Sequence, residues 1–180
     1  IFKFLTFWII KLGYLKNINI IKSITKNDPN PFYQENLPEN YKLNISNYQA
    51  HCIKKQLPNV NQNYLTRKIF FQTYYDGLKD IEELQIPKYD KNINDPYISF
   101  PILYKKRDEL IKFMFLNNRD IAHYFYRNCN DIKFFSKYFN PEIKKIKLIV
   151  NNIILLPTYS KYSLSDVRKN IKIIREFFKK

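Results

Sequence analysis

The sequence predicts an α+β fold, in which a long helix precedes a short, mostly antiparallel sheet flanked by helices. Three patterns support this prediction. Apolar residues recur with a helical period over residues 59–79, alternate with polar ones over 97–104, and run without interruption over 153–156. These patterns are typical of a helix with one buried face, a half-buried strand and a fully buried strand, respectively.

The first quarter of the chain predicts a helix followed by a linker. Residues 1–27 favour a helix, and the stretch Asp28–Pro31 stops it. Residues 28–40 are rich in Pro and Asn, which is typical of a linker. We therefore divide the chain into a helical arm and linker, residues 1–40, and a domain, residues 41–180.

The opening stretch Ile1–Leu15 is strongly apolar, but it is too short and too charged to cross a bilayer. A span needs about 20 apolar residues, and Lys3, Lys11 and Lys16 interrupt this one. No small-residue cleavage site follows, which argues against a signal peptide. A basic amphipathic helix lying on a membrane is one alternative. We expect instead that its apolar face packs against a domain outside this chain.

Two consecutive helices are predicted next. Asn44 or Ser46 can cap a helix that runs to Leu57, where Pro58 intervenes. The long helix Asn59–Lys79 follows. Its predicted buried face consists of Val60, Tyr64, Phe71, Tyr75 and Leu78.

Strands are predicted after the long helix. Residues Leu84–Pro87 can form a short one, and Tyr97–Tyr104 has the clearest strand pattern in the sequence. Pro101 lacks a backbone donor, so this strand lies at an edge or is unpaired on that side. Alternation places four residues on one face: Ile98, Phe100, Ile102 and Tyr104.

Short helices and a strand are predicted between residues 107 and 150. Arg107–Leu116 is a helix with acidic residues in its first turn, which suits the helix dipole. Ile121–Phe125 is a candidate strand, and Lys133–Phe139 predicts a helical turn or two. Pro141 fits the first turn of a further helix. Three of its side chains are expected to face inward: Ile143, Ile146 and Val150.

The last two elements are a strand and a helix. Ile153–Leu156 is the buried strand, and Pro157 ends it. Ser163 or Ser165 caps the final helix, and Asp166 completes a capping box with Ser163. The apolar face of this helix comprises Leu164, Val167, Ile171, Ile174 and Phe178.

The formal net charge of +15 allows two interpretations. One is an anionic partner, either nucleic acid or a membrane. The other is codon bias. The chain is crowded with Ile, Lys, Asn, Phe and Tyr, which AT-rich codons encode, and has only two Gly, so an AT-biased genome would raise the charge without selection for binding. The lysines are scattered along the whole sequence, whereas a binding footprint concentrates them. We therefore predict neither a nucleic-acid nor a membrane partner, with a basic nucleic-acid-binding module as the alternative.

The cysteines and histidines predict neither a disulfide framework nor a metal site. Cys52 and Cys129 are far apart in sequence and neither belongs to a Cys-x-x-Cys pair. His51 and His123 have no metal-type spacing. Reduced thiols and a cytoplasmic location are the expectation.

Five segments carry short motifs in a fixed order: Asn44–Ala50, Tyr74–Leu78, Phe100–Leu110, Asp120–Tyr126 and Ile154–Phe178. Together they resemble the C-terminal half of DegT/DnrJ/StrS-type aminotransferases. The first two segments are similar to the family's Arg-Met-Ser-Asn-Leu-Gln-Ala and Tyr-x-x-Gly-Leu motifs, and the third is similar to a strand leading to Arg-Asp-Glu-Leu. The fourth is placed like the family's Gly-Ile-Asp segment and aromatic strand, and the last like Leu-Pro-x-Tyr and a terminal Ile-Arg-Glu-Phe helix.

The resemblance implies the small domain of a fold-type I transferase that uses pyridoxal 5'-phosphate. It also implies a nucleotide-sugar substrate, an amino donor, and a homodimer when the enzyme is complete. The family's Asn-x-Arg before the Ser of the first motif is absent, and Lys42 and Asn44 stand there instead. The family's Asn meets the cofactor phosphate of the neighbouring subunit. Lys42 can meet a phosphate as a point charge.

Five residues are candidate contacts of a complete site. Lys42 and Asn47 are cofactor candidates, although Asn47 and Gln49 can equally serve in capping and surface hydrogen bonds. The family's Tyr-Pro-x-Pro-x-His is replaced by residues 126–129, YRNC. The substrate candidates nevertheless lie nearby, and an Arg can bind a phosphate with two hydrogen bonds. Each also has a purely structural interpretation: a strand residue for the histidine, a core residue for the tyrosine and a solvated charge for the arginine. These candidates are His123, Tyr126 and Arg127.

The chain is not expected to bind the cofactor productively by itself, and we predict no catalytic residue in it. Transamination needs a lysine that bonds covalently to the cofactor aldehyde, an acid at the pyridine nitrogen and a phosphate cradle. In the resembled family these lie in a large domain, where a glycine-rich stretch follows the lysine. Two isolated glycines do not make such a stretch. Because no Met opens the chain, we expect a fragment, a half with a separate partner or a non-catalytic remnant.

Overall fold

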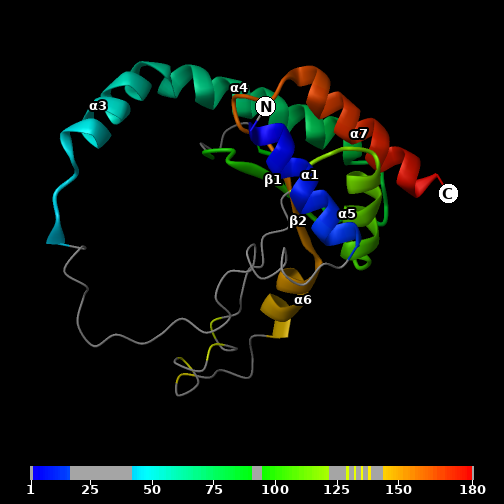
Figure 1. Ribbon diagram of the computed structural model, residues 1–180. Coiled ribbons are helices and arrows are strands. Elements are labelled where there is room, and N and C mark those ends of the chain that lie inside the picture. Colours follow the sequence, from blue (N-terminus) through cyan, green and yellow to red (C-terminus); the bar gives the residue numbers. More distant parts are fainter. Residues whose placement is uncertain are drawn as a thin grey trace.

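The computed structural model describes residues 2–16, 42–90, 95–121 and 144–179, together with four single positions between 129 and 138. Two antiparallel strands cross the middle of the molecule, and helices lie around them (Figure 1). The predicted α+β class with a short antiparallel sheet is therefore confirmed. In chain order the elements are α1 (Phe2–Leu15), α3 (Asn47–Gln56), the 3₁₀ turn η2 (Leu57–Asn59), α4 (Val60–Leu78), β1 (Ser99–Leu103), α5 (Arg107–Leu116), α6 (Lys144–Asn152), β2 (Ile153–Pro157) and α7 (Leu164–Phe178).

The sheet consists of β1 and β2, with Phe100 opposite Leu156. On its other side β1 makes a single bridge, in which the backbone of Leu103 exchanges two hydrogen bonds of 2.9 and 3.1 Å with Gln85. The predicted strand at 84–87 is thus reduced to one residue. Amide groups two residues apart point the same way in a strand. The Pro101 nitrogen, which has no hydrogen, therefore faces away from β2, as the Leu103 amide does. The edge position expected for Pro101 is confirmed.

The alternation predicted for β1 holds for two of its four residues in full. Phe100 and Ile102 are completely buried, and Tyr104 is half-buried. Ile98 is a correction, because it is 66% exposed. The backbone of Tyr97 has a positive φ of 49°, so the regular strand begins only after it. Tyr97 takes the buried place instead, and its carbonyl accepts a 2.6 Å hydrogen bond from the Thr158 hydroxyl.

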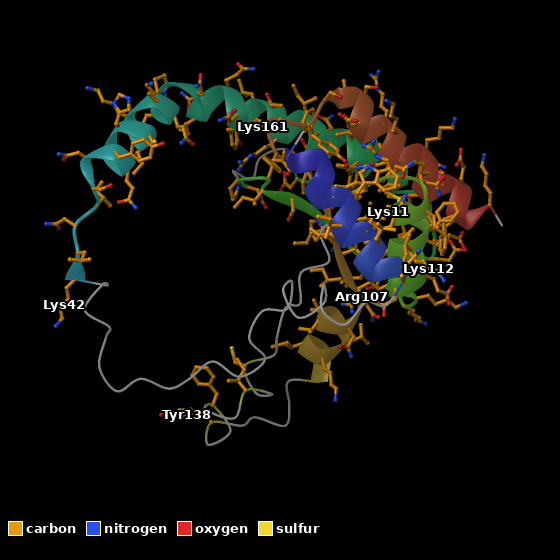
Figure 2. All side chains as sticks on the ribbon, in the orientation of Figure 1. Lys11, Lys42, Arg107, Lys112, Tyr138 and Lys161 are labelled. Carbon is orange, nitrogen blue, oxygen red and sulfur yellow. The ribbon has the colours of Figure 1, made fainter. Side chains whose placement is uncertain are left out.

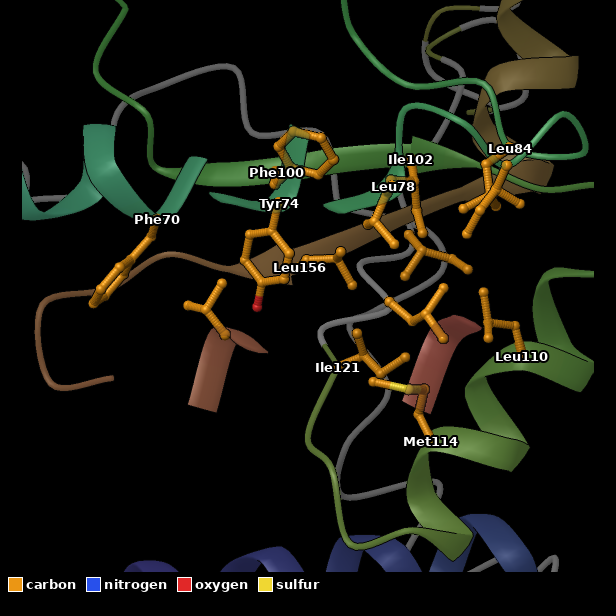
Figure 3. Close-up of a cluster of buried hydrophobic side chains, with 14 of the residues drawn as sticks. Phe70, Tyr74, Leu78, Leu84, Phe100, Ile102, Leu110, Met114, Ile121 and Leu156 are labelled. Atoms are coloured by element: carbon orange, nitrogen blue, oxygen red, sulfur yellow. The ribbon is translucent and has the colours of Figure 1, made fainter. Parts of the chain in front are cut away.

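The core lies where α4, α5 and α7 meet the sheet (Figure 3). The ring of Phe100 stacks on Tyr74 at 5.5 Å and meets Phe71 edge-on at 4.7 Å. Leu110 and Met114 of α5 are completely buried beside them. Such aromatic pairs each add roughly 0.5–1.5 kcal/mol beyond the area they bury. The predicted long helix, α5, the buried strand and the final helix are all confirmed, but Val60, which the predicted buried face of the long helix included, is 53% exposed.

The N-terminal helix packs within the chain. The structure ends α1 at Leu15, and the rest of the predicted helix and linker lies outside the described residues. Phe7 meets the ring of Phe115 on α5 at 6.3 Å, and the Lys11 ammonium donates to Asn118. The face that we expected to pack on another domain thus contacts α5, while Leu12 stays exposed.

Helix α6 extends from the start of β2 toward the edge of the described structure (Figure 1). Its last turn is held by two hydrogen bonds of 3.0 Å, from the Arg107 guanidinium to the Val150 carbonyl and from the Tyr104 amide to the Asn152 carbonyl. Val150 is half-buried, as predicted, but Ile146 is 39% exposed and corrects the expected inward face. Ile143 and the predicted elements at 122–125 and 133–139 fall outside the described ranges, apart from isolated positions.

The segment after α5 is held by a Schellman turn. Asn118 has the left-handed φ of 57° that such a turn requires after a helix, and Asn tolerates it better than most residues. The amide of Arg119 donates to the Met114 carbonyl at 2.9 Å, and the amide of Asn118 to the Phe115 carbonyl at 3.0 Å. This turn delivers the Arg119 side chain toward α7.

Arg119 and Asn170 form the centre of a buried polar network. The Asn170 amide oxygen accepts from Arg119 Nε at 2.5 Å, and its amide nitrogen donates to the Tyr74 hydroxyl at 2.8 Å. Arg119 also donates to the Tyr162 hydroxyl at 3.0 Å and to Asp166 at 3.3 Å. Burial raises the pKa of Tyr74 and, to a smaller extent, that of Tyr162, so both phenols stay neutral. The network ties α4, the α5 turn and α7 together.

Both helix starts that were predicted to be capped have capping boxes. The amide of Asp166 donates to the Ser163 hydroxyl at 3.1 Å, and the amide of Ser163 donates back to the carboxylate at 3.2 Å. Ser46 and Gln49 do the same at the start of α3. The caps are therefore Ser46, not Asn44, and Ser163, not Ser165.

Helices α4 and α7 approach most closely at Gly77. A Cβ atom built there would lie 2.8 Å from both Cδ1 and Cγ2 of Ile171, which is too close for real atoms. A branched side chain on a helix is stiff about χ1, so Ile171 has little freedom to move aside. The glycine is therefore required by helix packing.

Replacing Gly77 should change stability in a way that depends on Ile171. Alanine favours a helix over glycine by about 1 kcal/mol, whereas overpacking costs about 1–3 kcal/mol. Gly77→Ala should therefore destabilise the wild-type protein, and it should stabilise the Ile171→Ala variant. The four proteins of this double-mutant cycle can be compared by urea unfolding. The same sign in both backgrounds would contradict the packing argument.

Removing the Asn170 amide should weaken the fold more than its size suggests. Asn170→Leu leaves the Arg119 guanidinium and the Tyr74 hydroxyl without their buried partner, which costs about 2–4 kcal/mol. Lys169→Leu, on the exposed side of the same helix, is the matched control and should change stability by about 0.5 kcal/mol or less. The free energies of unfolding in urea decide between them, and equal values would show that the network adds no stability.

The Asp166 carboxylate should contribute stability that disappears in acid. Its hydrogen bond with the Ser163 hydroxyl, followed by the backbone amide and Arg119, lowers the pKa of Asp166. A group whose pKa is lower in the folded state stabilises the protein above its unfolded pKa, about 3.9 for Asp, and loses that effect as the pH falls. The difference in unfolding free energy between wild type and Asp166→Asn should therefore shrink from pH 6 to pH 3. A constant difference would contradict this assignment.

Candidate functional site

The two cofactor candidates lie at the start of the helical segment, α3 and the first half of α4, that extends away from the sheet (Figure 1). Lys42 precedes α3 and is exposed, far from the sheet (Figure 2). Asn47 is the first residue of α3 and is also exposed. Because Ser46 and Gln49 close the capping box, Gln49 is occupied in capping, as its alternative interpretation held. Asn47 takes no part in that box.

The segment from Lys42 to the start of α3 suits an anion better than a cation. The first turn of a helix carries partial positive charge from its backbone amides, and α3 has no acidic residue in that turn. Lys42 adds a full charge five residues before Asn47. A phosphate group would therefore find a point charge, a side-chain amide and a favourable helix end here. The described residues fit this part of the cofactor.

The three substrate candidates, His123, Tyr126 and Arg127, lie outside the described residues. The chain leading to them is firmly placed, because Arg119 is bound in the polar network and Ile121 is almost completely buried. The structure thus fixes where this segment leaves the core, next to α7. Lys42, before α3, lies far from α7 (Figure 2).

Arg119, Asn170 and Tyr162 form the main polar cluster that sequence reasoning missed. Asn170 interrupts the apolar face of the last helix one residue before Ile171. A polar residue on a buried stripe signals an interior hydrogen bond, so this position was a detectable clue. All three side chains are engaged with one another, which makes the cluster a structural clasp.

Tyr159 lies on the outer side of the clasp, where its ring meets Tyr162 edge-on at 5.0 Å. Burial, followed by the neighbouring Tyr162 and Asp120, raises the pKa of Tyr159 to about 12. The phenol is therefore neutral at physiological pH and can donate a hydrogen bond. A half-exposed, neutral phenol fits a contact with a polar ligand or a partner surface better than a role as a base.

A hollow of about 320 Å³ lies beside the end of α4, between Glu82, Glu83 and Phe178. The Arg175 guanidinium at its wall donates to the Gly77 carbonyl at 2.8 Å and pairs with Asp80. That pairing lowers the pKa of Asp80. Arg175 is already bound to a carboxylate and a carbonyl, and three carboxylates line the hollow beside its other cation, Lys179, so the hollow offers little to an anionic ligand.

Two further features bear on the possible chemistry. No group of three or more His, Cys, Asp or Glu side chains in the described ranges is placed to hold a metal ion. Among the described helices, none has the length and apolar character needed to cross a membrane.

Comparison with known protein families identifies one match. Residues 15–175 match the DegT/DnrJ/EryC1/StrS aminotransferase family. A search of curated protein sequences found no match. Among solved structures, a DegT DnrJ EryC1 StrS aminotransferase from Brucella abortus is similar, with a TM-score of 0.69 at 18% identity over 90% of this chain and 43% of that chain.

Two other solved structures share the fold. Helicobacter pylori PseC, an aminotransferase involved in the biosynthesis of pseudoaminic acid, gives a TM-score of 0.63 at 19% identity over 86% of this chain and 42% of its own. DesI, solved in the presence of its TDP-sugar product, gives 0.58 at 13% identity over 67% of this chain and 32% of its own. The chain spans less than half the length of each of these proteins. The family match over most of the sequence shows that the chain belongs to the DegT/DnrJ/EryC1/StrS aminotransferase family.

Proposed function

We propose that this chain is the C-terminal portion of an aminotransferase that uses pyridoxal 5'-phosphate and acts on nucleotide-linked keto-sugars. The observation that supports this most strongly is the family match over residues 15–175, combined with the order of the five motifs. The complete enzyme is a cytoplasmic homodimer in this proposal. The chain itself lacks the domain that carries the cofactor lysine, so it is inactive without that domain.

The cofactor, when bound in the complete enzyme, accepts an amino group from a donor and passes it to the sugar. In this proposal Lys42 and Asn47 reach the cofactor phosphate, because both are exposed at the positively polarised start of α3. His123, Tyr126 and Arg127 contact the nucleotide-sugar. The residues 41–180 form the domain that presents both sets, and residues 1–40 are the arm and linker.

Reconstitution tests the proposal directly. The purified chain is mixed with the cofactor-lysine polypeptide of the same family encoded in the same genome, and two signals are measured. These are the visible absorbance of the protein-bound cofactor and the amination of a nucleotide-linked keto-sugar by mass spectrometry. We expect both signals from the mixture and neither from the chain alone. Cofactor binding by the chain alone, or a complex inactive on every keto-sugar tested, would contradict the proposal.

The role of Lys42 can be separated from a general effect of charge. Loss of one phosphate contact by a lysine should weaken cofactor binding roughly tenfold, which corresponds to about 1.4 kcal/mol. Lys42→Ala should show this loss in the reconstituted complex. Lys161→Ala removes the same charge from an exposed position well separated from Lys42 (Figure 2). Equal cofactor affinities for the two variants would remove Lys42 from the site.

A further inference from the structure

Helix α1 precedes the part of the chain that matches the family. The family match begins at residue 15, so α1 (Phe2–Leu15) contributes only its last residue to it. On one side α1 packs on α5 (Figure 1), through the rings of Phe7 and Phe115 and through the hydrogen bond from Lys11 to Asn118. The fold shared with the family therefore leaves the other side of α1 without an assigned role.

The outward side of α1 is an apolar face that ends in a cation. Ile9, Leu12 and Lys16 follow one another at three and four residues, so they share one face of the helix. Ile9 is 46% exposed and Leu12 is 42% exposed. The Lys16 amide donates to the Leu12 carbonyl at 2.9 Å, which continues the last helical turn as far as this exposed lysine. A cation is favoured at that end of a helix.

Trp8 lies one turn before Leu12, at the border of this face. Its ring meets Phe7 edge-on at 6.3 Å, and the Lys11 ammonium lies 4.5 Å from the ring centroid. Lys11 itself is buried, because it turns inward to Asn118. The half-buried indole is thus held in place from the inner side. Such amphipathic rings are enriched where lipid meets water.

The charge and length of α1 suit a helix that lies on a membrane. Residues 1–27 contain five lysines and no Asp or Glu, in a chain that has 16 acidic residues. Anionic lipids attract basic segments of this kind. A helix of 14 residues rises about 21 Å, which is less than the hydrocarbon thickness of about 30 Å. Apolar and aromatic side chains on one face, with lysines beside them, are typical of helices that lie in the lipid–water interface.

We propose that the exposed face of α1 binds an anionic membrane surface, with the helix axis along that surface. Nucleic acid would pair with the lysines but leave Ile9 and Leu12 in water. A second copy of α1 would bring like charges together. Net charge by itself favours no such partner, because the lysines are scattered over the whole sequence. The apolar face of α1 beside a local excess of lysines does favour it.

Vesicle binding by the full chain tests this proposal. Vesicles of equal parts phosphatidylglycerol and phosphatidylcholine are compared with vesicles of phosphatidylcholine alone by cosedimentation. We expect binding to the first and much weaker binding to the second. Trp8 is the only tryptophan of the chain, so its fluorescence reports on α1. The emission should shift to the blue on binding and be quenched by brominated lipid.

Matched variants locate the contact. Leu12→Asp should weaken binding to the anionic vesicles roughly tenfold or more, and Ile98→Asp, at a position that is 66% exposed outside α1, should leave it unchanged. Lys16→Glu should weaken binding roughly fivefold or more. Lys169→Glu makes the same change in net charge at an exposed position of α7 and should have much less effect. All four side chains are exposed, so urea unfolding of the variants should resemble that of the wild type.

Several outcomes would overturn the proposal. One is that the chain binds neither kind of vesicle, and another is that the α1 variants and their controls lose binding equally. Vesicle binding without quenching of Trp8 would place the contact elsewhere on the chain. Self-association, or binding to a short single-stranded DNA, that Leu12→Asp abolishes while no vesicle binding is seen would assign the face to another occupant.

The reconstituted complex shows whether the face stays accessible in the complete enzyme. Vesicle binding is repeated with the chain bound to the cofactor-lysine polypeptide. Binding that persists supports the proposal, and binding that the polypeptide abolishes overturns it, because α1 is then covered. Amino transfer is measured on the same samples without vesicles. Membrane binding and the proposed function can therefore fail separately.

Discussion

The close approach of α4 and α7 is the constraint on which the rest of the structure depends. At Gly77 the two helices meet with no room for a side chain, and Ile171 fills the space. One residue before Ile171 on α7, Asn170 donates to the Tyr74 hydroxyl of α4 and accepts from Arg119, which follows the turn after α5. The two strands then lie against a helix pair whose spacing is already set.

The same constraint determines the direction of the segment from Lys42 through the first half of α4. Helix α4 is one continuous helix from Val60 to Leu78, so its buried second half orients its exposed first half. A helix transmits direction over its length, and α4 spans about 28 Å at 1.5 Å per residue. Lys42 and the start of α3 are therefore positioned by packing that lies far from them. A change at Gly77 would therefore affect a site near Lys42 by changing the direction of α4.

Much of the fold could be predicted because its signals are local. Periodicity located α4 and α7, the Ser163–Asp166 spacing located a cap, and Pro101 located a sheet edge. The errors arose where tertiary structure overrides the local pattern. The left-handed backbone of Tyr97 displaced Ile98 from the buried face, and the direction of α6 exposed Ile146. The clasp was missed because Arg119 and Asn170 are 51 residues apart and meet only in the folded chain. Resemblance to a family supplied the site candidates, since periodicity alone contains no chemistry.

The proline in β1 also bears on how this protein behaves at high concentration. A strand edge with regularly spaced donors is a template on which other chains can pair and grow into fibrils. On the free side of β1, Leu103 is already bonded to Gln85, and Pro101 has no hydrogen to offer. An incoming strand would find two successive positions closed to it. This edge of the sheet is thereby protected from pairing with a strand of another chain.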